Sequence, residues 1–334
     1  MKILLASTCF LAGLASSSMP TFAADCGNVS LAMHINVQSA EVLAYVDKFI
    51  LENGFDCTVE MMPGDTVPST TSMVEKEQPD VSPETWVDLL PEIVPRGLKD
   101  NKIVEAAKAL PDGGIQGWWI PKYVADAHPD IKTVEDALNH PDLFPDPEDA
   151  KKGVIFNGAE GWGATIVTAQ LFKAYKAGDK GFRLMNPGSA AGLDGAIAKA
   201  YERKEGFITY YWAPTALLGK YDLVRLDVTA PEDPVEWKRC ITNLDCADPK
   251  PVRWPTDTIY TLLTKKFADS APSEVVKYFN TRGWSNETVS KLMAWQTENQ
   301  ATGEDGSKHF LQENKDIWSK WVSGDVAEKV ESAL

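Results

Sequence analysis

Residues 151–167 read KKGVIFNGAEGWGATIV and contain, in order, a buried-strand pattern, a glycine-rich turn and the start of a helix. Glycine is selected where the backbone needs a positive φ or a close approach to another group. Gly161 and Gly163 flank Trp162, so a large aromatic ring stands at a turn built for close approach. In open α/β sheets, ligands bind at the carboxyl ends of strands. Trp162 is therefore a candidate ligand-binding residue.

The same alternation of strand and helix recurs along the chain. Val42, Tyr45, Val46, Phe49 and Ile50 recur at helical spacing between two short β-patterns. The sequence predicts strands at 29–33, 57–61, 153–156, 207–211 and 222–226, and further helices at 70–76, 164–175 and 194–201. A βαβαβ run requires a parallel sheet, and about 310 residues exceed what one core usually serves. We therefore expect two α/β lobes.

Two segments are candidates for the connections between the lobes. Residues 116–124 read as an extended strand because Pro121 disfavours helix. A proline-rich stretch, 230–255, precedes a strand-like run at 258–263. The resulting organisation is a first lobe formed by 24–120 and 255–334, and a second lobe formed by 121–254. The C-terminal part is predicted to be helical, with tryptophans in packing positions at Trp284, Trp295, Trp318 and Trp321.

The first 23 residues have the pattern of a cleavable secretory signal. Lys2 precedes an apolar run, and small residues lead to Ala23. The apolar run is shorter than the roughly 20 residues that span a bilayer. We expect the signal to be removed and the product to be released into the periplasm.

The charge of the chain excludes one class of partner. The full sequence carries a net charge of −15. Removal of the signal takes away one lysine and no acidic residue, which leaves about −16. Nucleic-acid binding depends on a basic surface, so a nucleic-acid partner is not expected.

The cysteines point to an oxidising compartment. Four remain after signal removal: Cys26, Cys57, Cys240 and Cys246. An even count predicts two disulfides with three possible connectivities. We favour Cys240 with Cys246, which are close in sequence, and Cys26 with Cys57, which precede strands expected to be neighbours. Zinc is the alternative, but the four histidines are scattered at His34, His128, His140 and His309.

Motifs for catalysis or for cofactors are scarce. The sequence has no Gly-x-Ser-x-Gly elbow, no P-loop and no His-Glu-x-x-His. Residues 158–163 are glycine-rich but do not follow the dinucleotide-binding order. We therefore predict a protein that is not an enzyme and that has no cofactor and no metal. Its rival is a secreted carbohydrate-active enzyme, because sugars also stack on tryptophan.

Three tryptophans stand at the ends of predicted strands. Trp86 follows Asp80-Val-Ser-Pro-Glu-Thr, Trp162 lies between two glycines, and Trp212 follows Phe207-Ile-Thr-Tyr-Tyr. Each one alone is as compatible with core packing as with binding. Together they indicate a ligand cleft.

Four motifs in this order resemble the substrate-binding proteins of ABC transporters for glycine betaine and related osmolytes. They are Asp80-Val-x-Pro-Glu-x-Trp86, Gly117-Trp-Trp-Ile-Pro-Lys-Tyr-Val124, Glu160-Gly-Trp-Gly163 and Tyr210-Tyr-Trp-Ala-Pro214. The resemblance covers nearly the whole mature chain. It implies the two-lobed type II periplasmic binding protein fold, with a parallel-rich sheet in each lobe and the ligand in the cleft between them. It also implies a monomer that delivers its ligand to a permease in the inner membrane.

The resemblance also implies site residues. Trp86, Trp162 and Trp212 correspond to the aromatic box around a quaternary ammonium head. The backbone N–H groups of Gly163 and Ala164 correspond to those that hold a betaine carboxylate. The implied ligand is a methylated onium osmolyte: glycine betaine first, then choline or carnitine, with trimethylamine N-oxide or a sulfonium compound as alternatives.

Other positions depart from some relatives or extend the site. Leu90 stands where certain betaine binders carry histidine, and Asn36 lies where others place an aromatic residue. We include Asn36 among the candidate ligand-binding residues. Trp119 is a candidate for a fourth wall, and Glu84 for contact with a polar or cationic edge of the ligand.

Overall fold

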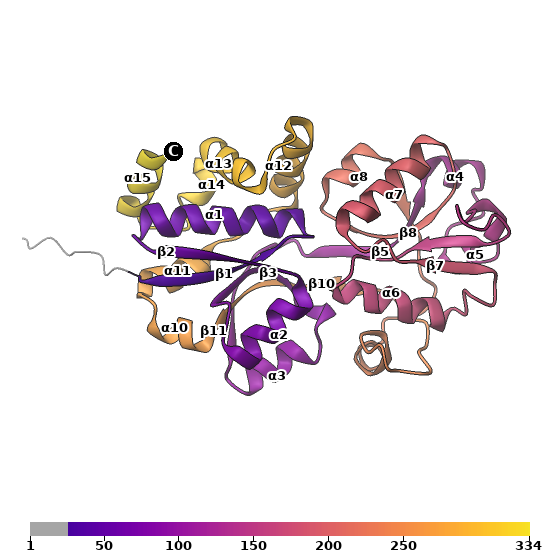
Figure 1. The fold of residues 1–334 in the computed structure, drawn as a ribbon, viewed down its shortest axis with the longest axis horizontal. Coiled ribbons are helices and arrows are strands. Elements are labelled where there is room, and N and C mark those ends of the chain that lie inside the picture. Colours follow the sequence, from indigo (N-terminus) through magenta and orange to yellow (C-terminus); the bar gives the residue numbers. More distant parts are fainter. Residues whose placement is uncertain (1–25) are drawn as a thin grey trace, which may run out of the picture.

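The computed structural model describes residues 26–334, so the expected signal segment lies outside the described residues. Two mixed sheets with helices on both faces lie side by side along the long axis (Figure 1). This arrangement agrees with the expectation of two α/β lobes.

The first sheet has the order β2-β1-β3-β11-β4. Its strands are β1 (Asn28–His34), β2 (Thr58–Gly64), β3 (Val81–Trp86), β4 (Ile103–Lys108) and β11 (Ile259–Thr264). β1, β2 and β3 are parallel, as the βαβαβ pattern predicts. β11 enters antiparallel between β3 and β4. The strand-like run predicted at 258–263 corresponds to β11, but the sequence pattern does not indicate its antiparallel place between β3 and β4.

Helices cover both faces of the first sheet. On one face lie α1 (Gln38–Gly54), α12 (Asn286–Asn299), α13 (Gly303–Glu313), α14 (Lys315–Trp318) and α15 (Gly324–Ala333). The other elements of this lobe are α2 (Thr66–Lys76), η1 (Val87–Leu89), α3 (Ile93–Lys99), α10 (Lys265–Ser270) and α11 (Ser273–Thr281). Val42, Val46 and Ile50 of α1 are fully buried, because their helical spacing places them on one face. Trp284, Trp318 and Trp321 are buried as predicted, and Trp295 stacks on His309.

The second sheet has the order β10-β5-β8-β6-β7, with β9 paired to β5. Its strands are β5 (Gly114–Pro121), β6 (Gly153–Phe156), β7 (Phe182–Met185), β8 (Ile208–Ala213), β9 (Leu223–Arg225) and β10 (Thr256–Asp257). Around it lie α4 (Lys122–Ala127), α5 (Val134–Ala137), η2 (Pro141–Leu143), α6 (Gly163–Ala174), α7 (Ala190–Glu202), α8 (Ala216–Lys220), α9 (Pro234–Glu236) and η3 (Trp237–Ile241). β6 is parallel to β7 and β8, whereas β5 is antiparallel to its neighbours.

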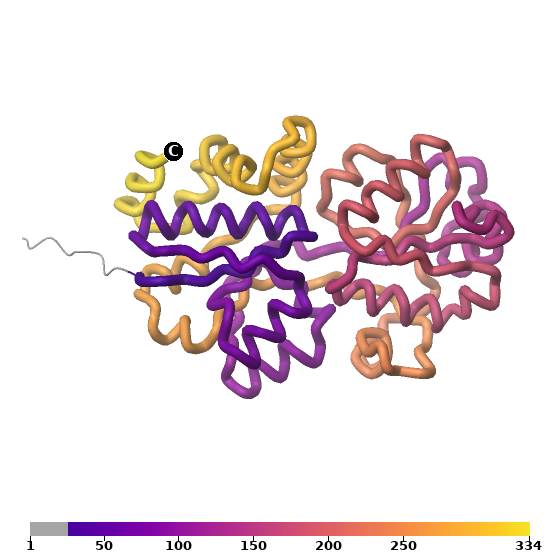
Figure 2. Tube along the Cα trace, viewed as in Figure 1, coloured from indigo at the N-terminus to yellow at the C-terminus, as the bar shows by residue number. Residues whose placement is uncertain are grey.

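The chain crosses between the sheets twice, through adjacent strands (Figure 2). β10 pairs with the start of β5, with Thr256 opposite Ile115 and Asp257 opposite Gly114. β5 belongs to the second sheet over its whole length, so this sheet begins before residue 121. We propose the lobe boundary at the start of β5 rather than at its end. Extended structure is also predicted for 122–124, but these residues begin α4, and Pro121 is the non-helical N-cap residue before it.

A buried ion pair joins the long helix α1 to the end of α11. Arg282 donates from Nη2 to Asp47 Oδ2 at 2.8 Å, and its Nε lies 2.6 Å from Oδ1. Both side chains are fully buried, and the Tyr278 hydroxyl also donates to Asp47. Burial raises the pKa of Asp47, while Arg282 and Tyr278 act in the opposite direction.

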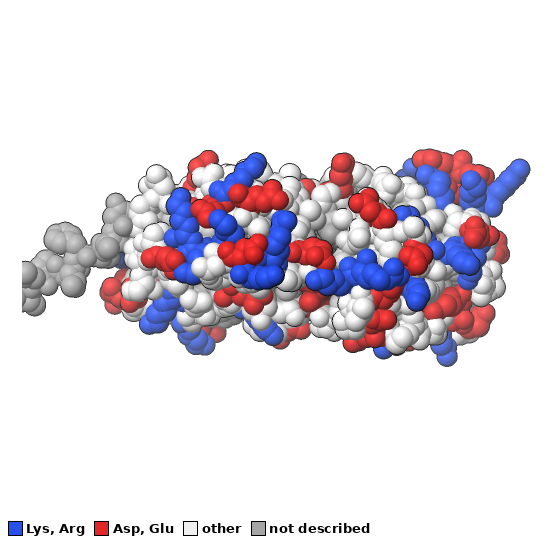
Figure 3. Space-filling view, turned by 90° about the horizontal axis from the view of Figure 1, so that it is seen from below, with Lys and Arg blue, Asp and Glu red and all other residues white. Residues whose placement is uncertain are grey.

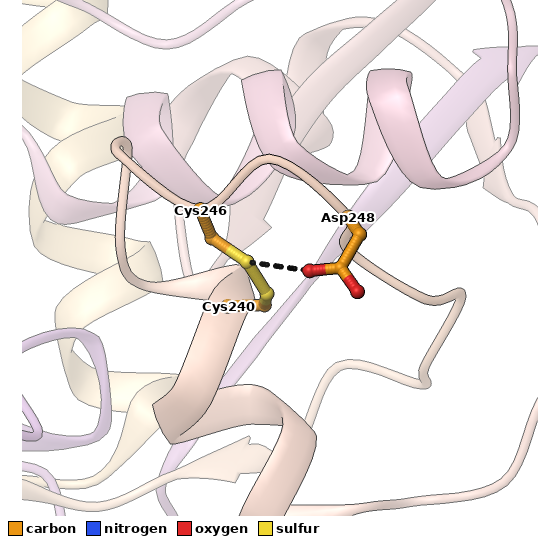
Figure 4. Close-up of side chains that lie close together, drawn as sticks. All are labelled: Cys240, Cys246 and Asp248. Atoms are coloured by element: carbon orange, nitrogen blue, oxygen red, sulfur yellow. Dashed lines mark hydrogen bonds between the residues drawn. A yellow bond between two sulfur atoms is a disulfide. The ribbon is translucent and has the colours of Figure 1, made fainter.

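Two disulfides join the cysteine pairs that the sequence favoured. Cys26 is bonded to Cys57, and Cys240 is bonded to Cys246. Asp248 lies beside the second disulfide, 3.7 Å from Cys246 Sγ (Figure 4). A disulfide sulfur carries no proton to donate and is not the thiolate that zinc binds, so this cluster gives no support to the zinc alternative.

Charges of both signs are interspersed on the face shown in Figure 3. Within residues 26–334, no helix combines the length and the apolarity needed to cross a bilayer.

The two disulfides should contribute unequally to stability. They close loops with sequence separations of 31 and 6 residues. In the chain-entropy model these correspond to about 3.5 and about 2 kcal/mol. Replacing Cys26 and Cys57 by serine should therefore lower the free energy of unfolding more than replacing Cys240 and Cys246. Denaturant titration of the two double variants measures the difference, and the reverse order would contradict this prediction.

Loss of the buried arginine should be severe at neutral pH. Arg282→Met leaves the Asp47 carboxylate buried without a counter-ion, which typically costs about 3–5 kcal/mol of unfolding free energy. Protonation removes the uncompensated charge, so the deficit should shrink as the pH falls. The double variant Asp47→Asn/Arg282→Met should recover part of the loss at pH 7. Denaturant unfolding at two pH values measures both effects, and a deficit that is independent of pH would count against this account of the pair.

Candidate aromatic binding site

Trp86 is the last residue of β3 and is 5% exposed. It lies against the start of β5, where the chain crosses between the sheets. A Cβ atom placed on Gly114 would lie 2.1 Å from Trp86 Cζ3. Only glycine leaves room for the indole there, so the Trp86 ring packs directly against the backbone of the crossing strand.

Trp162 is the residue that precedes α6, and two glycines let it stand there. Gly161 has a φ of +86°, and a Cβ on it would lie 2.9 Å from Asp65 Cβ of the first lobe. A Cβ on Gly163 would lie 2.8 Å from the carbonyl oxygen of Leu89, also in the first lobe. The two glycines therefore allow the turn to pack closely against the first lobe, in addition to any contact with a ligand.

Trp212 lies near the end of β8 and meets Trp162 edge to face. Their ring centroids are 5.0 Å apart, at an interplanar angle of 87°. Tyr210 stacks on Trp212 with 6.1 Å between centroids, and Trp254 also stacks on Tyr210 at 5.6 Å. The two tryptophans form a corner that a layer of aromatic rings supports.

The rings enclose a cavity of about 30 Å³ between the two sheets. It is lined by residues of both lobes, among them Trp86, Trp162, Trp212, Tyr210, Gln116 and Ala164. None of the described residues that line it is acidic or basic. A water molecule needs roughly 10–15 Å³ measured in this way, so the cavity must widen to accept an organic head group.

The start of α6 lies at the same cavity. Ala164 lines it, and Gly163 is the first residue of the helix. The first N–H groups of an α-helix have no intrahelical acceptor, and the helix dipole favours an anion there.

Four predicted site residues do not line the aromatic cavity: Gly163, which precedes the lining residue Ala164, and also Glu84, Trp119 and Asn36. Glu84 is fully buried behind Trp86 and does not line it. Trp119 donates its indole N–H to the carbonyl oxygen of Tyr211 at 3.0 Å, so its side chain joins two strands of the second sheet. Asn36 donates to Asp65 at 3.0 Å and accepts from the N–H of Ala190 at 3.3 Å, which links the two lobes. Asn36 lines a neighbouring cavity of about 470 Å³, which also reaches Trp212.

Sequence reasoning missed a polar chain behind Tyr210. The Tyr210 hydroxyl donates to Gln116 Oε1, and Gln116 Nε2 donates to Asp257 Oδ2 at 2.6 Å. Asp257 is 1% exposed, and burial raises its pKa well above the usual value. Tyr210 could have been found from its place two residues before Trp212, because such residues share one face of a strand. Gln116 and Asp257 are far apart in sequence and carried no such signal.

Comparison with known proteins adds a family and a fold. Residues 28–313 match the family model described as the substrate-binding domain of ABC-type glycine betaine transport systems. No curated protein sequence matches the chain.

Several solved structures have the same fold at low sequence identity. A glycine betaine/L-proline-binding protein from Borrelia burgdorferi is 19% identical, with a TM-score of 0.71 over 91% of this chain and 99% of that one. A choline-binding protein in complex with choline is 17% identical, with a TM-score of 0.72 over 92% and 98%. A lactococcal protein complexed with glycine betaine is 17% identical, with a TM-score of 0.66 over 89% and 100%. These likenesses establish the type II periplasmic binding protein fold.

The family match covers far more than half of the sequence and runs through both sheets and the aromatic cavity. The chain therefore belongs to the family of substrate-binding domains of ABC-type glycine betaine transport systems, whose members are binding proteins and not enzymes.

Proposed function

We propose that this protein captures a methylated onium osmolyte in the periplasm and delivers it to an ABC importer in the inner membrane. The observation that carries the proposal is the meeting of Trp86, Trp162 and Trp212, from both lobes, at one cavity. Glycine betaine is the proposed first ligand, followed by choline and carnitine. Trimethylamine N-oxide and sulfonium osmolytes are the alternatives.

The chemistry of the wall fits this class of ligand. A trimethylammonium group has no N–H to donate, so hydrogen bonds to a carboxylate cannot hold it. Aromatic faces supply both cation–π attraction and apolar contact with the methyl groups. Three desolvated faces at about 2 kcal/mol each supply about 6 kcal/mol, and micromolar affinity requires about 8 kcal/mol. The first N–H groups of α6, at Gly163 and Ala164, are proposed to bind a carboxylate at the other end of the ligand.

The rival function, a carbohydrate-active enzyme, loses its support. The family comprises binding proteins that carry out no reaction on their ligands, and the lining residues include no carboxylate pair for glycoside cleavage.

A panel of osmolytes should separate the ligands by thermal stability. A ligand at 100 times its Kd stabilises the folded state by about 2.7 kcal/mol. Glycine betaine should raise the melting temperature most, with smaller shifts for choline and carnitine. Glucose and maltose serve as controls and should give no shift. Stabilisation by the sugars alone would refute the proposal.

The role of Trp162 can be tested against a matched tryptophan elsewhere. Trp162→Ala removes one aromatic face, so the Kd for the best onium ligand should rise about thirtyfold. Trp162→Phe should retain part of the affinity. Trp295→Ala, in α12 and stacked on His309, should leave the Kd unchanged.

Calorimetric titration measures the Kd of each variant, and denaturant unfolding measures its stability. Trp162 also packs against Tyr210 and Trp212, so some loss of stability is expected from Trp162→Ala. Native affinity in folded Trp162→Ala would exclude the role assigned to this residue.

A further inference from the structure

Glu84 is a fully buried carboxylate that directly supports a wall of the aromatic cavity. Its Oε1 atom accepts hydrogen bonds from Trp86 Nε1 at 3.1 Å and from Ser39 Oγ at 2.9 Å. Its Oε2 atom is buried without a hydrogen-bond partner among the described residues. The Trp86 indole therefore contacts the cavity and the carboxylate at once.

The surroundings leave Glu84 without a counter-ion of its own. Arg282 is the nearest cation, but it forms a close pair with Asp47 on α1 and donates to the carbonyl oxygen of Pro83. His34 on β1 contacts the backbone of Glu84, and burial lowers the pKa of His34 to about 4, so it is neutral at physiological pH. From β11 the contact is the neutral Thr261, which donates to the same Pro83 carbonyl.

A tether for the indole does not require a charge. A glutamine could accept the Trp86 N–H through its amide oxygen, and it would avoid the free energy needed to bury a carboxylate. What the carboxylate adds is negative potential behind the ring. A negative charge at the N–H edge strengthens the attraction of the ring face for a cation. It also attracts the cation directly through a medium of low dielectric constant.

We propose that Glu84 is a specificity-determining residue, which acts through Trp86 to favour a cationic head group over a neutral group of the same shape. This inference rests on the proposed onium-binding function and goes beyond it. In this arrangement the aromatic rings supply shape and apolar contact, and the buried carboxylate supplies selectivity for charge. The carboxylate stands behind the ring because a quaternary ammonium group offers it no hydrogen bond.

Because Glu84 titrates, the preference for a cationic ligand should depend on pH. Burial raises the pKa of Glu84 to about 7. At pH 8 the side chain is mostly ionised, and at pH 6 it is mostly protonated. Preference for the cation should therefore weaken as the pH falls from 8 to 6. By linkage, a bound cation favours the ionised form, so binding near pH 7 should release part of a proton.

The test compares choline with 3,3-dimethylbutan-1-ol, in which carbon replaces the quaternary nitrogen. At pH 8, Glu84→Gln should weaken choline binding about 10- to 20-fold, the order expected for one charge about 10 Å away at an effective dielectric constant of about 20. Binding of the neutral alcohol should change less than twofold. Asp146→Asn is the matched control, because it also turns a buried carboxylate into an amide, but beside Arg183 in the second lobe. It should leave the ratio of the two affinities unchanged.

A second measurement detects the proton itself. Calorimetric titration of the wild-type protein with choline at pH 7, in buffers of different ionisation enthalpy, should show proton release, and Glu84→Gln should abolish it. Equal losses of choline and alcohol affinity in Glu84→Gln would show a purely structural role and overturn the proposal. So would proton release that persists in the variant, because Asp257 or Asp65 would then be its source. If no onium compound binds the wild-type protein, the proposed function itself fails, which is a different outcome.

Discussion

The two crossings between the lobes are hydrogen-bonded neighbours, and the rest of the site depends on this constraint. Because β10 pairs with the first residues of β5, the two sheets can approach each other in few ways. The end of β3, the turn after β6 and the end of β8 then face one gap, and each carries one tryptophan. The same arrangement requires glycine at position 114, because any side chain there would collide with Trp86.

Close approach of the lobes explains the glycines of the turn before α6. Gly161 meets the Asp65 side chain and Gly163 meets the Leu89 carbonyl, both across the gap. The Asn36 amide bridges Asp65 and the N–H of Ala190. Larger residues at 161 and 163 would hold the lobes apart, so this turn couples the position of Trp162 to the distance between them.

The aromatic residues of the cavity wall also carry N–H and O–H groups. Several of these groups are linked, directly or through Gln116, to acidic residues outside the cavity. Glu84 accepts from Trp86, and Asp257 holds Gln116, which in turn accepts from Tyr210. The Trp162 indole lies close enough to Asp65 to lower its pKa, against the rise that burial causes. Its N–H lacks hydrogen-bond geometry to any acceptor among the described residues, so we regard this contact as electrostatic. The lining thus carries aromatic rings and no charged side chain, while carboxyl groups lie one layer behind it.

The sequence by itself determined the α/β class, the paired cysteines and the three wall tryptophans, because periodicity, residue type and strand ends are local properties. The Asp80–Trp86 and Glu160–Gly163 motifs carried the family resemblance for the same reason. Only the tertiary structure decided that β11 inserts between β3 and β4, that Glu84 faces away from the cavity, and that Gln116 and Asp257 stand behind Tyr210. These contacts join residues that are far apart in the sequence; Thr261 of β11 and Pro83 of β3, for example, are 178 positions apart. Burial and the direction of a side chain depend on the packing of both sheets, which no local pattern records.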